Sequence, residues 1–228
     1  MAVSLSSVGT LLYFTAGNDI PKPSGSGAGV VVVACGWFSD PTNAPTITGF
    51  SIADTVRDLR PTDETATRAL YKYVSDLSSE PANYSPGGGI GSSSLIAQSY
   101  FFTGVDSTTP IVGTSSDAEW TPAQQIVIPN VNATRAGSYS ILFCNDWNFS
   151  VWQLSGFGGG QTPPSGFTAA DPSNASEYAY FYQSGLGAGN VGGSFGSTTD
   201  DRFAVIQVVL QPPEESVIIP TYSSYITA

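Results

Sequence analysis

The stretch GSYSILFCNDW, residues 137–147, decides the fold class. Successive side chains of an extended strand point to opposite faces, so Tyr139, Ile141 and Phe143 share one face. The side chains of the opposite face are Ser138, Ser140, Leu142 and Cys144. Both faces are largely apolar after Ser140, which is typical of a strand buried inside a sheet. The stretch therefore predicts a central strand.

Similar short runs of β-branched and aromatic residues recur along the chain, each bounded by Gly, Pro, Ser, Asp or Asn. No segment keeps a 3.6-residue apolar period for three turns, so we expect no long helix. The expected strands are residues 10–16, 29–38, 68–74, 94–105, 124–129, 137–147, 176–186 and 202–210. We predict an all-β protein, a jelly-roll-like antiparallel β-sandwich of about eight strands with extended terminal arms.

The predicted organisation is a single sandwich domain over residues 1–212, followed by a C-terminal arm at 213–228. The N-terminus contributes a strand or arm, and Gly and Pro predict a loop around 17–28. Pro61 and several Thr residues predict a loop over residues 54–68. In residues 68–74, the face that carries Lys72 is expected to be the solvated one.

The charge balance excludes several classes of function. The chain has 7 basic and 18 acidic residues, a formal net charge of −11, so nucleic acid and anionic membrane surfaces are not expected as partners. It has no histidine, which excludes every His-dependent mechanism. The longest apolar run, at 30–35, is far shorter than the ~20 residues that cross a bilayer, so we expect no membrane insertion.

The N-terminus has no Lys or Arg before its apolar stretch, so we expect mature structure there and not a secretory signal. Cys35 and Cys144 permit one disulfide. Both lie in apolar, strand-like runs, where a reduced cysteine behaves as a small hydrophobic residue. We favour two buried thiols over the disulfide.

Catalytic motifs are present only as short glycine-rich strings. Gly187, Gly189 and Gly192 match the dinucleotide-binding spacing, but no helix is predicted after them to receive a pyrophosphate. Ser194, between Gly192 and Gly196, matches a nucleophile elbow, which requires a strand-to-helix turn and a histidine. We interpret both strings as one flexible loop and predict no cofactor and no enzyme activity.

Carboxylates and aromatic side chains leave two weaker hypotheses open. A glycosidase needs two suitably separated carboxylates, and the candidates are Asp106, Asp117, Glu119, Asp146, Asp171, Glu177, Asp200 and Asp201. We favour solvated loop acids, and we expect no metal at Asp200 and Asp201 or at Asp40 and Asn43. A sugar-stacking platform would use Trp37, Trp120, Trp147, Trp152, Tyr178, Tyr180 and Tyr182, but packing in a core or interface is favoured.

The layout over residues 28–212 resembles a family of tailed-bacteriophage virion proteins. The similar stretches are GVVVVACGWFSDP (29–41), ALYKYVS (69–75), IAQSYFFTGVDSTTPI (96–111), GSYSILFC (137–144) and DRFAVIQVVLQP (201–212). In that family a strand that ends in Tyr or Phe is followed by a Gly, an acidic residue and a Pro, and here Tyr100, Gly104, Asp106, Pro110 and Ile111 stand in that order. The resemblance implies a jelly-roll-like sandwich on a phage particle, and it brings no active-site residues.

We therefore expect a non-enzymatic virion structural protein, either associated with the tail or decorating the capsid, assembled in the host cytoplasm. Its expected partners are other virion proteins and copies of itself in a homo-oligomer. The expected assembly interface is Val217, Ile218, Ile219, Tyr222 and Tyr225 of the C-terminal arm. The alternative is a carbohydrate-binding adhesin module that recognises host surface glycans.

Overall fold

The structure is a computed structural model that describes residues 1–13, 19–38, 44–57, 65–88, 95–146, 167–170 and 178–215. The first half of the chain forms a six-stranded antiparallel sheet, the N-terminal sheet, in the order β1-β10-β4-β7-β6, with β2 also paired to β10. Its strands are β1 (Ser4–Val8), β2 (Leu12–Tyr13), β4 (Gly29–Phe38), β6 (Ser51–Arg57), β7 (Thr65–Val74) and β10 (Leu95–Thr103).

The second half forms a five-stranded antiparallel sheet, the C-terminal sheet, in the order β11-β15-β12-β14-β13. Its strands are β11 (Ile111–Ala133), β12 (Ser138–Asp146), β13 (Thr168–Ala170), β14 (Tyr178–Leu186) and β15 (Gly189–Leu210). Two short pairs lie apart from both sheets: β3 (Ile20–Pro21) with β8 (Asn83–Tyr84), and β5 (Thr46–Ile47) with β9 (Pro86–Gly87). One 3-10 turn, η1, spans Leu77–Ser79.

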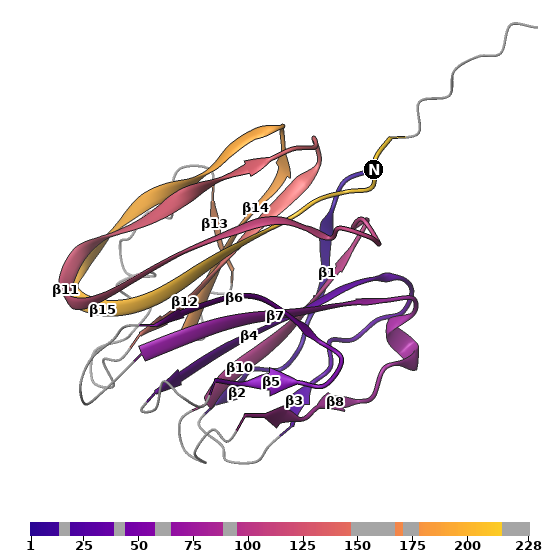
Figure 1. Ribbon diagram of the computed structural model, residues 1–228, viewed down its shortest axis with the longest axis horizontal. Helices are drawn as coiled ribbons and strands as arrows, with labels where there is room; N and C mark the ends of the chain where they lie inside the picture. Colours follow the sequence, from indigo (N-terminus) through magenta and orange to yellow (C-terminus); the bar gives the residue numbers. More distant parts are fainter. Residues whose placement is uncertain are drawn as a thin grey trace, which may run out of the picture.

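The two sheets stack face to face and share the central core (Figure 1). The N-terminal sheet contributes alternate residues of β4, namely Val30, Val32 and Ala34. The C-terminal sheet contributes Tyr139, Ile141, Phe143, Ile206, Val208 and Leu210. A buried hydrogen bond of 2.9 Å from Thr67 Oγ1 of β7 to the carbonyl oxygen of Ala204 in β15 also joins the sheets. These contacts fix the sheets relative to each other.

The outer face of the N-terminal sheet is also buried. The other side chains of β4, Val31, Val33 and Cys35, point to this face and are 0% exposed. They pack against residues of the short segments on that side, which are Leu12, Ile20, Ile47, Leu77 and Tyr84. The strand is therefore buried on both faces, which explains its nearly continuous apolar sequence.

The long ribbon of β11 and β15 covers the outer face of the C-terminal sheet. The pairing register of β11 with β15 shifts between Glu119 and Ala123 and again between Ala123 and Gln125. Figure 1 shows the ribbon curving back over the sheet. A Cβ atom added to Gly113 would lie 2.8 Å from Val131 Cγ1, so the two ends of β11 touch. Ile128, Val131 and Val191 of the returning part form a second core with Leu142, Cys144, Val205 and Val209.

These observations confirm the all-β antiparallel sandwich, and β12 is a central strand between β15 and β14. The jelly-roll connectivity is not confirmed. In a jelly roll, two Greek keys carry the chain repeatedly between the sheets. Here the described strands up to Thr103 complete one sheet before the strands from Ile111 form the other. The two sheets also hold more strands than the eight expected.

Three local predictions need correction. Within 54–68, expected to be a loop, Asp54–Arg57 belong to β6 and residues 65–68 to β7, because pairing between these strands outweighs local preference. The expected strands 124–129 and 202–210 are confirmed as strand, but they are parts of the much longer β11 and β15. The Lys72 face of β7 is not solvated at Leu70 and Val74, which are 1% and 3% exposed beneath the short segments.

Both cysteines are free and buried, as predicted. Cys35 belongs to the core outside the N-terminal sheet, and Cys144 belongs to the core under the ribbon. The two sheets lie between them, so they cannot pair without unfolding. Burial raises the pKa of the Cys35 thiol to about 12, with the nearby Arg68 opposing the shift, so the thiol is unreactive at neutral pH.

We predict that a reducing agent leaves the melting temperature unchanged. Replacing Cys144→Ser should lower the free energy of unfolding by about 1 to 3 kcal/mol, because a hydroxyl is harder to satisfy than a thiol in an apolar core. Thermal melts with and without reductant check the first statement, and urea titration of the variant checks the second. A drop of several degrees in reductant alone would contradict the assignment of free thiols.

Candidate functional site

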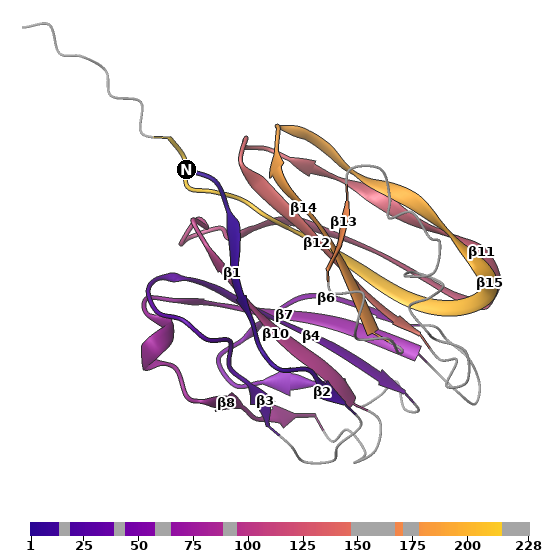
Figure 2. The ribbon, with the colours of Figure 1, turned by 180° about the vertical axis from the view of Figure 1, so that it is seen from behind.

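Three segments meet at one end of the sandwich. Residues 104–110 cross between the sheets, residues 134–137 connect β11 to β12, and residues 211–215 follow β15. Their contacts centre on Asp106, Arg135, Gln211 and the exposed Glu214, a group that we call the clamp. It lies where both described ends of the chain leave the sandwich (Figures 1 and 2).

Asp106 is the centre of the clamp. Its Oδ1 accepts hydrogen bonds from the backbone N–H of Thr108 and Thr109, at 2.8 and 3.0 Å, and from the Thr108 hydroxyl at 2.9 Å. Its Oδ2 accepts from Arg135 Nη1 at 2.5 Å. The backbone N–H of Thr109, the Arg135 guanidinium and the backbone N–H of Thr108, in that order, hold the pKa of Asp106 well below its usual range.

Arg135 joins this carboxylate to the C-terminal segment. Its Nη1 also donates to the carbonyl oxygen of Pro212 at 2.8 Å, and its Nη2 donates to Glu214 Oε1 at 3.0 Å. The Arg135 and Asp106 side chains are 22% and 11% exposed, whereas Glu214 is 82% exposed. The shielded pair is therefore the stronger one, and the Glu214 pair contributes little. The guanidinium fixes the backbone at Pro212.

Gln211 fastens the same segment from the other side. Its Nε2 donates to the Thr109 carbonyl oxygen and hydroxyl, at 2.8 and 3.0 Å, and its Oε1 accepts from Thr134 Oγ1 at 3.0 Å. Its backbone N–H donates to the Pro110 carbonyl oxygen, and its own carbonyl accepts from the Asp106 N–H. The crossover and the C-terminal segment are thus held together by main-chain and side-chain bonds.

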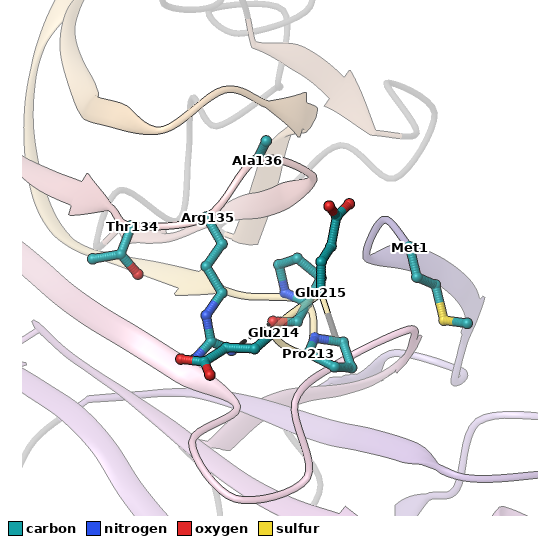
Figure 3. Close-up of a pocket in the computed structure, with 8 residues that line it drawn as sticks. Met1, Thr134, Arg135, Ala136, Pro213, Glu214 and Glu215 are labelled. Carbon is teal, nitrogen blue, oxygen red and sulfur yellow. Dashed lines mark hydrogen bonds and ion pairs between the residues drawn. The ribbon is translucent and has the colours of Figure 1, made fainter. Parts of the chain in front are cut away.

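The N-terminus packs against the same end. The Val3 N–H donates to the Gly137 carbonyl oxygen at 2.9 Å. Gly104 has a φ of +69°, and a Cβ atom there would lie 2.4 Å from the Ala2 carbonyl oxygen, so a larger residue would displace the N-terminus. An open depression of about 520 Å³ remains, lined by Met1, Thr134, Arg135, Ala136 and residues 212–215 (Figure 3).

This geometry suits structural support more than catalysis. A carboxylate with a strongly lowered pKa is a poor proton donor or acceptor near neutral pH. Of the family-like pattern, Gly104 and Asp106 form the crossover, and Tyr100, 0% exposed, lies in the central core. Among the described residues, no group of three His, Cys, Asp or Glu side chains could hold a metal ion. In that part of the chain, no helix is long and apolar enough to cross a membrane.

Arg135 and Gln211 were not identified from the sequence. The sequence does offer one signal for Arg135. The chain has only 7 basic residues, and Arg135 lies between an expected strand and Gly137, which marks a turn. Gln211 gives no such signal, since its role depends on Thr109 and Thr134, which are remote in sequence.

The other candidate residues are placed as follows. Of the glycine strings, Gly187 lies in the turn between β14 and β15, whereas Gly189, Gly192, Ser194 and Gly196 belong to β15, so most of the expected flexible loop is strand. Trp37 is 1% exposed, and Tyr182 stacks on Tyr139 with ring centroids 5.7 Å apart, which confirms core packing for these aromatics. The expected interface residues Val217, Ile218, Ile219, Tyr222 and Tyr225 lie outside the described residues, as do Trp147, Trp152, Asp40, Asn43, Asp171 and Glu177.

Comparison with protein-family models, with curated proteins and with solved structures finds no match to the chain.

We predict that Asp106→Asn lowers the free energy of unfolding at pH 7 by about 1 to 3 kcal/mol, the range of hydrogen bonds to a charged group. Because the folded-state pKa of Asp106 is lowered, its contribution is complete above the unfolded pKa of about 4 and is lost as the pH falls toward the folded value. The difference between the variant and the native chain should therefore narrow below about pH 4.

Urea unfolding between pH 3 and pH 7 measures this difference. Glu214→Gln is the matched control, because its exposed ion pair should contribute about 0 to 1 kcal/mol. Equal effects of the two substitutions at pH 7 would contradict the central role of Asp106.

Proposed function

We propose that this protein is a non-enzymatic structural component of a tailed-bacteriophage virion, associated with the tail or decorating the capsid. It assembles with copies of itself and with other virion proteins through the C-terminal arm, residues 213–228. The resemblance of residues 28–212 to that family supports the proposal at the level of sequence pattern.

The clamp is the observation that carries the proposal. It holds Gln211 and Pro212, the two residues before the arm, against the end of the sandwich through bonds to Thr109 and Arg135. The part of the arm that follows Glu215 has no charged residue and includes three adjacent aliphatic side chains, Val217, Ile218 and Ile219. A firmly held base followed by an apolar segment is suited to contacts between subunits, because the base sets the direction in which the segment leaves.

The covering of the two sheets also favours this role. The chain's own segments cover the outer faces of both sheets, as the core outside the N-terminal sheet and the core under the ribbon show. Contacts with neighbouring subunits would therefore involve the ends and edges of the sandwich, where the arm begins. This arrangement agrees with attachment through a terminal segment.

Three cations of the N-terminal half, Lys22, Arg68 and Lys72, have structural partners. Lys22 Nζ donates to the Leu77 and Glu80 carbonyl oxygens, each at 3.0 Å, and Lys72 pairs with the Glu80 carboxylate at 2.7 Å. Arg68 Nη1 donates to the Pro45 carbonyl oxygen at 2.9 Å. These cations hold the short segments against the N-terminal sheet. Their role is therefore to stabilise the fold and not to take part in a reaction.

Truncation after Glu215 tests the proposal, because it removes the apolar segment and keeps the clamp. We predict unchanged circular dichroism and melting, together with weaker self-association in sedimentation velocity and fewer copies per phage particle. Replacing Val217, Ile218 and Ile219 together by Ser in the full-length chain should reproduce the loss, since the apolar contacts are then removed without shortening the chain.

The control is Ser216→Ala, which leaves the apolar residues in place and should assemble normally. Normal incorporation of the truncated protein would refute the role of the arm. A full-length protein that stays monomeric and binds no phage particle would refute the virion function itself, and gold-labelled antibody on intact particles would locate it.

A further inference from the structure

The outermost strand of the N-terminal sheet, β1, begins beside the clamp. Val3 is bonded to Gly137, and Met1 lines the same depression as Glu214 and Glu215. Figures 1 and 2 both show β1 starting next to the segment that follows β15. The place where the arm leaves the sandwich is therefore adjacent to the start of an edge strand.

Among the described strands, β1 is hydrogen-bonded to β10 alone, so its other edge has no strand partner. Edge strands usually carry charged residues or proline that prevent pairing with another chain. The opposite edge of this sheet, β6, follows that rule with Asp54 and Arg57. The sequence of β1 is SLSSV, without charge or proline, and Ser4 and Ser6 are exposed.

The arm has the composition of a strand that could add to such an edge. Residues 221–228, TYSSYITA, combine Tyr, Ile and Thr, which favour strands, with no charged residue. The stretch is longer than the five residues of β1. Pro220 separates it from the aliphatic residues before it, so the added strand would begin after the proline.

Charge favours this pairing over other contacts between copies. Each chain has a formal net charge of −11, so most of the surface of one copy repels the other. Both β1 and residues 216–228 are uncharged, and their pairing brings no acidic groups together. Backbone hydrogen bonds then supply the attraction, as in other cases of strand addition.

We infer that residues 221–228 of one copy add as a strand to the open edge of β1 in a second copy. The inference rests on the proposed function and names the surface that accepts the arm. On each copy the described start of the arm lies beside the start of β1, so a two-fold axis lets two copies exchange arms reciprocally. The residues from Glu215 to Thr221 span about 20 Å when extended, which permits the crossing.

Site-directed crosslinking tests this inference. A mass-tagged Ser6→Cys chain is mixed with an untagged Ser224→Cys chain and oxidised with copper-phenanthroline. We expect a disulfide-linked heterodimer of the two masses on a non-reducing gel. Cys35 and Cys144, at 0% and 1% exposure, do not compete. The control pairs Ser224→Cys with Ser51→Cys, an exposed residue on the opposite edge, and should give no heterodimer.

A crosslink that forms only when Ser6→Cys and Ser224→Cys share one chain would overturn the exchange, because the arm then pairs with its own β1. Absence of any crosslink would overturn β1 as the acceptor. The substitution Ser224→Pro provides an independent test, since it removes a backbone N–H donor from the added strand. Ser224→Pro should weaken self-association as strongly as truncation after Glu215, and Ser224→Ala should not.

The results separate this inference from the proposed function. If truncation reduces incorporation into particles but the crosslink fails, the arm acts elsewhere and the proposed function stands. If truncation has no effect on incorporation, the proposed function fails.

Discussion

Burial of β4 and β12 on both faces is the constraint on which the rest of the structure depends. Val30, Val32 and Ala34 face the other sheet, while Val31, Val33 and Cys35 need a separate cover. A fully buried aliphatic side chain contributes roughly 1.5 to 3 kcal/mol. If the outer face of either sheet were exposed to water, the stabilisation from several buried side chains would be lost. The short strands below one sheet and the returning ribbon above the other satisfy this requirement.

The clamp follows from the single crossover between the sheets. Because the described strands of each sheet come from one half of the chain, residues 104–110 carry the connection between the two halves. Asp106 orders this connection through its bonds to Thr108 and Thr109, and Arg135 extends the order to the C-terminal segment. The same bonds thus stabilise the junction of the sheets and set the point where the arm leaves.

The sequence predicts the strands whose apolar pattern is strong, and it fails where pairing is decided by distant residues. Residues 29–38 coincide with β4, because the strand is apolar on both faces and bounded by turn-forming residues. β1 and β6 are rich in Ser, Thr, Asp or Arg, and only their neighbours β10 and β7 make them strands. The Gly- and Ser-rich strings from Gly187 to Gly196 predict a loop, but pairing with β11 holds residues 189–196 extended. Among the clamp residues, Asp106 stands in the Gly–acid–Pro pattern noted in the sequence. The role of Gln211 follows only from its contacts with residues distant in the sequence, such as Thr109.

The division of the sheets between the two halves of the chain has a consequence for synthesis on the ribosome. All the described strands of the N-terminal sheet have been made once Thr103 is added. The C-terminal sheet must wait longer, since Ile111 pairs with Leu210 and β12 lies between strands that follow it in the sequence. Pairings across such a separation form slowly. During that interval the nascent first sheet exposes Val30, Val32, Tyr100 and Phe102, a flat apolar surface of the kind that aggregates. We therefore expect the nascent chain to be most prone to aggregate in the interval before the second sheet is complete.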